Sequence, residues 1–169
     1  MQSVRIRKGL STDLQKVSEI HIRAWKSAYK GILPDEMLDQ LNLGRRIQGW
    51  QMILEKEQGQ LFVLEVGEEL VGFTHIEAAR DKDLDVKNVG EMTSIYLEPE
   101  SVGRGFGKAL LEYSLDKLRQ SHFTQMSLWV LKDNKLAIDF YERNGFVFDG
   151  TQFVDPDRGF VSHRYIRHL

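Results

Sequence analysis

The chain has 169 residues, of which 41% are hydrophobic and 28% are charged, a balance typical of one globular domain with its own core. Its formal net charge of -2 provides no basic face for nucleic acid or for anionic lipid. It contains no cysteine, which excludes disulfides, thiolate metal ligands and a cysteine nucleophile.

The N-terminal segment "MQSVRIRKGL" lacks the apolar run of a signal peptide. No stretch of about 18 apolar residues could form a membrane-spanning helix. No repeat or proline-rich linker interrupts the sequence. We therefore predict a single domain over residues 1–169, located in the cytoplasm, with no nucleic-acid partner, no membrane partner and no metal.

The first part of the sequence predicts one strand followed by helices. "VRIRK" alternates apolar and charged residues, which is the period of a half-buried strand. Thr12 and Gln15 have the spacing of a capping box, and the apolar stripe after them predicts a helix from about 12 to 30. A short second helix over about 34–42 and a third to about residue 58 follow.

The rest of the sequence alternates strands and helices. "QLFVLEV" and "LVGFTHIEA", split by "GEE", predict a hairpin, and a charged loop leads to the strand "EMTSIYLEP". A helix carrying Leu111, Leu115 and Leu118 on one face comes next, then the strand "FTQMSLWVL" and the helix "NKLAIDFYERN". "GFVFDGTQFV" and "FVSHRYIRH" predict a closing hairpin. This order predicts an α/β (α+β) fold, a single mixed sheet with helices on its faces.

A glycine-rich turn joins the strand that ends at Pro99 to the helix after it. Gly103, Gly105 and Gly107 occupy three of five positions there, although glycine costs a helix about 0.5–1 kcal/mol relative to alanine at an interior position. Bare amides at the positive end of a helix dipole bind anions, and Lys108 adds charge. An ordinary glycine-rich surface turn explains the same residues about equally well.

Two nucleotide-binding patterns fit this turn poorly. The dinucleotide pattern G-x-G-x-x-G has Lys108 at its sixth position, and no acidic residue follows at the end of a second parallel strand. The P-loop pattern puts Val102 at its first glycine and Ala109 at its hydroxyl position. Because no hydroxyl is available for magnesium, we do not expect nucleotide hydrolysis.

Two motifs together resemble those of a known family. "VGRGFGKALL", with "N..A..FY...GF" one strand later, is similar to the Gcn5-related N-acetyltransferase (GNAT) family, which transfers acetyl from acetyl-CoA to amines. The family turn Q/R-x-x-G-x-G/A matches at Gly105 and Gly107, whereas Val102 replaces the usual Gln or Arg. The segment "HIRAWKSAYKGILPDEMLDQL" resembles a subgroup of small bacterial-type acetyltransferases. The resemblance implies about seven strands, largely antiparallel, splayed in mid-sheet at the cofactor site.

The resemblance also implies acetyl-CoA as the cofactor and assigns its contacts. Main-chain groups of Ile95, Tyr96 and Leu97 would pair with the pantetheine arm like an added strand, and an amide there would serve the oxyanion. Asn134 would cap its helix, meet the pantetheine, or do both. The pyrophosphate would bind the turn, at Val102, Gly103, Arg104, Gly105, Phe106, Gly107 and Lys108.

The reaction needs a base and an acid. An amine of pKa near 10.4 costs about 4.6 kcal/mol to deprotonate at pH 7, so a proton acceptor is required. The resemblance implies Glu91 as this base, acting through water, and Tyr141 as the acid that protonates the leaving thiolate. A solvated strand-end carboxylate and a core aromatic are the alternative interpretations. Glu77, His75 and the Tyr96 hydroxyl are further candidates for the base.

The acceptor amine is expected on the opposite side, between the first helices and the last hairpin. Aromatic side chains with a carboxylate suit a cationic amine, and they also suit plain packing. The residues concerned are Trp25, Tyr29, Ile32, Phe153 and Asp155. We expect an acetyl-CoA-dependent N-acetyltransferase that acts by direct attack of a primary amine of a small molecule, peptide or protein. A non-catalytic acyl-CoA sensor and O-acetyl or longer-acyl transfer are alternatives, and the resemblance makes a homodimer possible.

Overall fold

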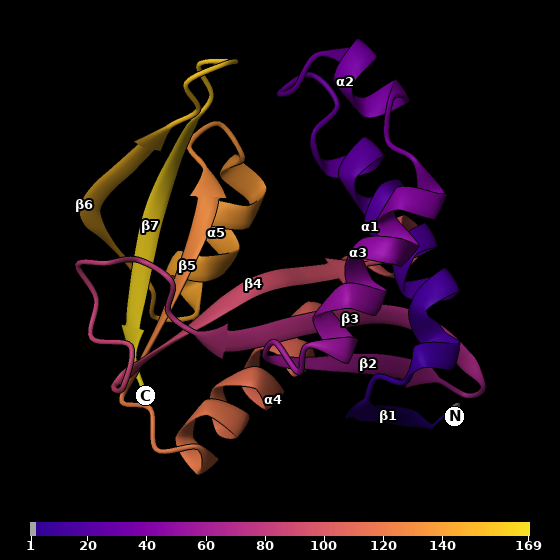
Figure 1. Ribbon diagram of the computed structural model, residues 1–169, viewed down its shortest axis with the longest axis horizontal. Coiled ribbons are helices and arrows are strands. Elements are labelled where there is room, and N and C mark those ends of the chain that lie inside the picture. The colour runs from indigo at the N-terminus through magenta and orange to yellow at the C-terminus, as the bar shows by residue number, and fades with distance from the viewer. Residues whose placement is uncertain (1–2) are drawn as a thin grey trace.

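Strands from both ends of the chain belong to one sheet in the computed structural model, which describes residues 3–169 (Figure 1). The sheet has seven strands in the order β1-β2-β3-β4-β5-β7-β6. The strands are β1 (Val4–Lys8), β2 (Gln60–Val66), β3 (Glu69–Ala78), β4 (Val89–Leu97), β5 (Gln125–Leu131), β6 (Val147–Val154) and β7 (Val161–His168). The α-helices are α1 (Leu14–Ala28), α2 (Asp35–Asp39), α3 (Leu43–Glu55), α4 (Phe106–Gln120) and α5 (Lys135–Arg143).

Every pair of neighbouring strands is antiparallel except β4 and β5, which are parallel. The predicted mixed, largely antiparallel sheet of seven strands is therefore confirmed. The two hairpins that the sequence predicts, β2–β3 and β6–β7, are both present. The β4–β5 connection needs a crossover, and α4 supplies it, as parallel strands require. Helix α5 joins β5 to β6 across the intervening strand β7.

The sheet opens between β4 and β5. These strands pair only where Val89, Gly90 and Glu91 face Gln125, Met126 and Ser127. Beyond Glu91 the two strands diverge, with β1–β4 and β5–β7 running in different directions (Figure 1). The first four residues of β4 are buried, and the last five are partly exposed because no strand covers that edge. The implied mid-sheet splay is therefore present.

Helices cover the two faces of the β1–β4 half of the sheet. Leu110, Leu111 and Leu115 of α4 are fully buried, as the apolar stripe of this helix predicts. On the other face, α1 and α3 pack together over β2 and β3 and enclose a second cluster that includes Ile20, Trp50 and other side chains. These two layers hold β4 from both sides, so the strand beside the opening has a rigid support.

The N-terminal helix begins differently from the prediction. A 3-10 turn spans Ser11–Asp13 and α1 covers Leu14–Ala28, so the predicted capping box of Thr12 and Gln15 is wrong. Asp13 is at the N-cap position of α1 but its side chain makes no hydrogen bond to this helix. Its carboxylate instead accepts a hydrogen bond from the Leu10 amide at 2.8 Å, which closes the 3-10 turn, and binds the guanidinium of Arg7. Arg7 of β1 therefore stabilises Asp13 in the position from which it hydrogen-bonds this turn.

The second and third helices also differ from their predicted bounds. The short helix α2 ends at Asp39 rather than near residue 42, and α3 ends at Glu55. Asn42 is the N-cap of α3, where its side chain accepts a hydrogen bond from the Arg45 amide at 2.9 Å. Asn42, which was predicted to lie at the end of the second helix, therefore begins the third.

Candidate cofactor and acceptor site

The glycine turn presents a row of unpaired amides. Gly103 and Gly105 have φ of 80° and 85°, a left-handed conformation that favours glycine. Within residues 3–169, no backbone amide from Gly103 to Lys108 donates a hydrogen bond, and Ala109 is the first to do so, to the Gly105 carbonyl at 3.1 Å. A Cβ at either of the two left-handed glycines would meet nothing within 4 Å. The turn therefore has donors and open space for an anion at the N-terminus of a 15-residue helix.

The side chains of the turn provide fewer anion-binding groups than its backbone does. Val102, at the position of the usual Gln or Arg, is 64% exposed and contributes no polar contact. The guanidinium carbon of Arg104 lies 5.0 Å from the centroid of the Phe106 ring, and Lys108 lies 3.7 Å from Glu112. The charge of Lys108 is thus partly balanced, and the amides remain the main anion-binding groups.

Tyr141 lies in the core next to the opening of the sheet. Only 9% of this residue is exposed, and its ring packs edge-on against those of Phe140 and Phe146. Burial, with a smaller contribution from Tyr96, raises the pKa of Tyr141 well above its usual range. The phenol therefore stays protonated at neutral pH and can act as a proton donor.

Two further tyrosines lie on the α1 side of β4. The hydroxyls of Tyr29 and Tyr96 are 3.3 Å apart, and the Tyr96 ring stacks on His21 with 4.8 Å between ring centroids. Burial raises the pKa of both phenols. Burial also lowers the pKa of His21 to about 3, so this imidazole is neutral at pH 7.

A cavity of about 500 Å³ lies on this face of the sheet. Helices α1 and α3 and strands β3 and β4 line it, together with the α2–α3 connection. Thr93 and Ser94 of β4, which follow the last residue paired with β5 by two and three positions, form part of its wall. Its lining residues also include His21, Arg45, Arg46, Trp50, His75, Glu77 and Arg80. A molecule in this cavity would lie beside the edge of β4 that the opening leaves uncovered.

One arginine in the wall of the cavity contacts two carboxylates. Glu91 is 2% exposed, and its oxygens accept from Arg80 Nη2 at 2.7 Å and Nε at 3.1 Å. Arg80 Nε also lies 3.2 Å from Oε1 of Glu77, which lines the cavity whereas Glu91 does not. Burial raises the pKa of Glu77, and Arg80 opposes this effect.

His75 has both ring nitrogens occupied. Nδ1 lies 2.5 Å from the Thr93 hydroxyl, and Nε2 donates to the Gln58 carbonyl at 2.8 Å. Burial lowers its pKa. The ring is therefore a neutral structural group of the cavity wall.

The predicted acceptor residues do not line this cavity. Trp25 and Tyr29 lie behind it, against His21 and Tyr96, and Ile32 follows α1. Phe153 is 54% exposed on β6, and the Asp155 carboxylate accepts from the amides of its own turn. The residues that sequence reasoning missed are His21, Arg45, Arg46, Trp50, Thr93 and Ser94.

The helix that carries Tyr141 begins as predicted. The Asn134 side chain accepts from the Ala137 amide at 3.3 Å, so its capping role is present. Gly145, with φ of 85°, follows the end of α5. A contact of Asn134 with pantetheine stays a prediction.

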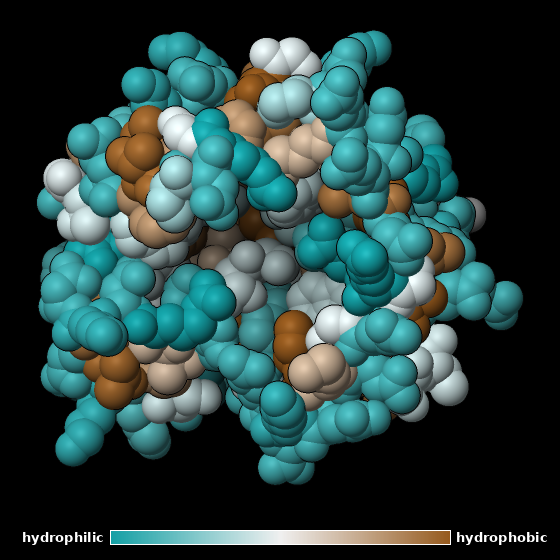
Figure 2. Space-filling view, turned by 45° about the horizontal axis from the view of Figure 1, so that its top comes forward, coloured by the Kyte–Doolittle hydropathy of each residue, from teal (hydrophilic) through white to brown (hydrophobic). Residues whose placement is uncertain are grey.

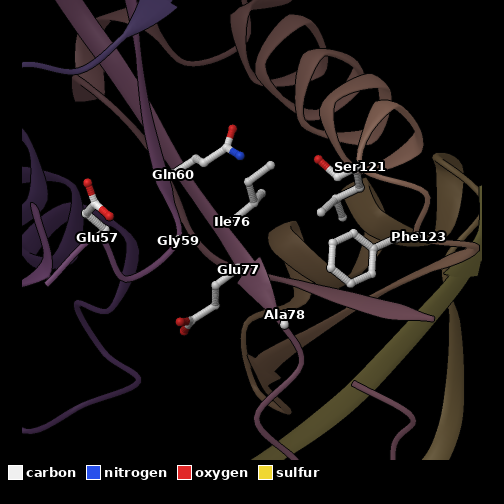
Figure 3. A pocket seen from close by; sticks show the side chains of 9 residues that line it. Glu57, Gly59, Gln60, Ile76, Glu77, Ala78, Ser121 and Phe123 are labelled. Atoms are coloured by element: carbon white, nitrogen blue, oxygen red, sulfur yellow. The ribbon is translucent and has the colours of Figure 1, made fainter. Parts of the chain in front are cut away.

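A smaller hollow of about 210 Å³ lies at the far end of β3, near the end of α4 (Figure 3). Figure 3 shows the Ile76 and Glu77 side chains pointing to opposite sides of β3, as neighbours on a strand do. Ile76 belongs to the core under α4, so Glu77 points toward the α1–α3 face. The hollow itself carries no convergent set of charged groups.

The surface of the molecule is hollowed near its middle, where residues of moderate hydropathy are surrounded by hydrophilic ones (Figure 2).

In the described part of the chain, no group of three or more His, Cys, Asp or Glu residues could hold a metal ion. None of the helices over residues 3–169 has the length and apolar character needed to cross a bilayer.

Comparisons with known proteins agree with this geometry. Residues 14–146 match the model of the acetyltransferase (GNAT) family. Spermidine N(1)-acetyltransferase of Thermoplasma acidophilum is 26% identical over 161 residues, which cover 90% of this chain and 95% of the relative. The uncharacterized N-acetyltransferase YuaI of Bacillus subtilis is 27% identical over 146 residues, covering 82% and 78%.

Solved structures show the same fold. PaiA N-acetyltransferase of Thermoplasma acidophilum, in complex with coenzyme A, superposes with a TM-score of 0.77 at 21% identity and covers 99% of both chains. The putative acetyltransferase YncA of Salmonella typhimurium, with its cofactor acetyl-CoA, has a TM-score of 0.74 at 20% identity and covers 99% of this chain and 94% of that one. Acetyl-CoA is the cofactor of this family, as predicted. The chain belongs to the acetyltransferase (GNAT) family and is an N-acetyltransferase.

Proposed function

We propose that this N-acetyltransferase transfers the acetyl group of acetyl-CoA to a primary amine of a small molecule or peptide by direct attack. The observation that carries the proposal is the row of unpaired amides from Gly103 to Lys108, which lies beside the uncovered edge of β4. Several amide bonds to charged oxygens, each contributing about 1.5–3 kcal/mol, would hold a diphosphate there.

The uncovered edge of β4 supports a place for the pantetheine arm. Ile95, Tyr96 and Leu97 have β3 on one side and no strand on the other. An extended amide-containing chain can pair with such an edge as an added strand. The cofactor, when bound, supplies a thioester whose carbonyl carbon is the electrophile, and a main-chain amide of this edge would stabilise its oxygen.

The chain's own groups would then move two protons. As the acceptor nitrogen replaces the sulfur on the acetyl carbon, Tyr141 would give its phenolic proton to the departing sulfur. The raised pKa of Tyr141 keeps that proton available. The acceptor's proton passes to a carboxylate of the cavity. No cysteine is present to form an acyl-enzyme.

Two carboxylates are candidates for that proton acceptor. Glu91, which the resemblance implies, has both oxygens bonded to Arg80 and lies outside the cavity wall. Glu77 lies in the wall, and burial raises its pKa in the direction that favours a general base at neutral pH. We therefore propose Glu77 as the proton acceptor in place of Glu91, whose carboxylate holds Arg80.

The proposal is tested by adding acetyl-CoA and a panel of primary amines and measuring thiol release, with product masses checked for one added acetyl group. Calorimetry with coenzyme A alone is run in parallel. We expect binding, and thiol release that depends on the amine. Binding with no turnover by any amine would instead support an acyl-CoA sensor, and an acetyl group trapped on the protein along the reaction path would contradict direct attack.

A further inference from the structure

The charges around the 500 Å³ cavity do not balance. Three guanidinium groups, those of Arg45, Arg46 and Arg80, line it against the single carboxylate of Glu77. His21 and His75 add no charge, because burial lowers the pKa of both imidazoles. The cavity therefore carries an excess of positive charge in a protein whose net charge is negative.

The three arginines differ in their partners. Arg80 is neutralised, since it contacts Glu91 at 2.7 Å and Glu77 at 3.2 Å. Within residues 3–169, neither Arg45 nor Arg46 lies within 4.0 Å of a carboxylate oxygen. The excess charge is thus confined to the α3 side of the cavity.

Arg46 is the better placed of the two free cations. It is half-buried, and its guanidinium carbon lies 5.3 Å from the centroid of the Trp25 ring. Burial lowers its pKa, which reflects the loss of hydration without a carboxylate to compensate for it. Stacking on an aromatic ring holds the guanidinium plane in place while its N–H groups remain available for an anion.

Arg46 is also close to the reacting region. Its charge acts on the Tyr96 phenol, opposing the larger effect of burial on the Tyr96 pKa, and Tyr96 in turn acts on Tyr141. Ser94, beside the uncovered edge of β4, lies in the wall of the same cavity as Arg46. A small molecule in the cavity can therefore reach the edge of β4 with one end and Arg46 with the other.

We infer that the acceptor carries an anionic oxygen group, a carboxylate or a phosphate, in addition to its amine, and that Arg46 binds this group with Arg45 beside it. This rests on the proposed function and specifies its substrate class. It also replaces the expectation that Asp155 would bind a cationic amine, because the Asp155 carboxylate accepts hydrogen bonds from its own turn and lies outside the cavity. A polycation would be repelled by the two arginines.

The test uses pairs of amines that differ only in charge. Glycine, β-alanine and 4-aminobutyrate are compared with their carboxamides, 2-aminoethylphosphonate represents the phosphate class, and spermidine represents polycations. Values of kcat/KM are measured for the full chain, and binding of each acid and amide to the coenzyme A complex is measured by calorimetry. We expect at least one acid to exceed its amide tenfold or more in kcat/KM and in affinity. The carboxylate and phosphonate arms distinguish the two sources of the anion.

The variant Arg46→Gln should reduce the acid-to-amide ratio of kcat/KM to near one, through a loss of kcat/KM for the acid. Arg119→Gln, which removes one positive charge from an exposed pair with Asp116, should leave the ratio as it is. Three outcomes would overturn the inference. The enzyme could prefer an amide or spermidine over the acids, the acid-to-amide ratio could stay unchanged in Arg46→Gln, or neither acid nor amide could bind. Selective binding of an acid with no turnover of any amine would support the anion site and contradict the proposed function, so the two failures are distinguishable.

Discussion

Arg80 and Glu91 form a two-point contact between an exposed guanidinium and a buried carboxylate, with Nη2 2.7 Å from Oε1 and Nε 3.1 Å from Oε2. The Arg80 amide adds a third hydrogen bond to Oε2 at 3.2 Å. This contact joins the start of the β3–β4 loop to the last part of β4 that still pairs with β5. It therefore holds Arg80 in place and, through Arg80, the neighbouring carboxylate of Glu77 in the wall of the 500 Å³ cavity.

The pH–rate profile should separate the two carboxylates. Glu77→Gln should lower kcat by about 100-fold and remove the acidic limb of the profile, because a general base contributes about 10²–10⁴-fold. Glu91→Gln should lower kcat less and leave the limb in place. Stopped-assay thiol release from pH 5 to 9 measures both. If the limb is lost only in Glu91→Gln, the base is the residue that the family resemblance implies.

Tyr141→Phe should lower kcat by about 100-fold with little change in the affinity for coenzyme A, since the phenol is assigned to protonation of the leaving sulfur. The raised pKa of Tyr141 further predicts that the wild-type rate shows no decline due to this residue below pH 10. Kinetics and calorimetry on one preparation test both points. A normal rate in the variant would reduce Tyr141 to a packing role.

Gly105→Glu should lower the affinity for coenzyme A by about 100-fold or more, because the new carboxylate would occupy the anion cradle and displace at least two amide contacts. The matched control is Gly159→Glu, which has the same open surroundings and a similar φ of 73° in the β6–β7 turn. Both variants carry the cost of a left-handed side chain. Equal affinity in both would remove the cofactor site from this turn.

Acid should destabilise the protein through His21. Its folded-state pKa of about 3 lies below the ordinary 6.5, so between pH 3 and 6.5 the unfolded chain binds more protons and the free energy of unfolding falls as the pH falls. At about 1.36 kcal/mol per unit, the loss from pH 7 to pH 5 is about 2 kcal/mol.

Thermal unfolding of His21→Phe should show a smaller drop in Tm over this range than the wild type, by about 4–8 °C. Phenylalanine preserves the stacking on Tyr96 and cannot be protonated. His168→Gln, an exposed position on the last strand, serves as the control and should behave as the wild type does. An unchanged drop in His21→Phe would show that this imidazole does not titrate differently on folding.

Features that depend on neighbouring residues were predictable from the sequence. The glycine turn, the stripe of leucines on α4, the Asn134 cap and the strands of both hairpins are patterns within about twenty residues, and each has the predicted structure. Periodicity and turn chemistry act locally, so they can be read without knowing the fold. The resemblance to a family extended this reading to the cofactor.

The start of α1 shows the limit of prediction from neighbouring residues alone. Thr12 and Gln15 satisfy the capping pattern, yet Asp13 organises the turn because Arg7, on β1, lies beside its carboxylate with Nη1 2.7 Å from Oδ2. A contact between two elements outweighs a local preference of about 1 kcal/mol.

By itself, the sequence determined the order of the elements and the bare amides of the turn, because glycine content and apolar period are properties of the chain. Only the tertiary structure decided which charged groups line the 500 Å³ cavity. His21, Arg46, Glu77 and Ser94 come from four separate elements, and no spacing along the chain relates them. Whether an arginine is neutralised depends on packing across the sheet. That packing places Arg80 against two carboxylates and leaves Arg45 and Arg46, in the described part of the chain, without one.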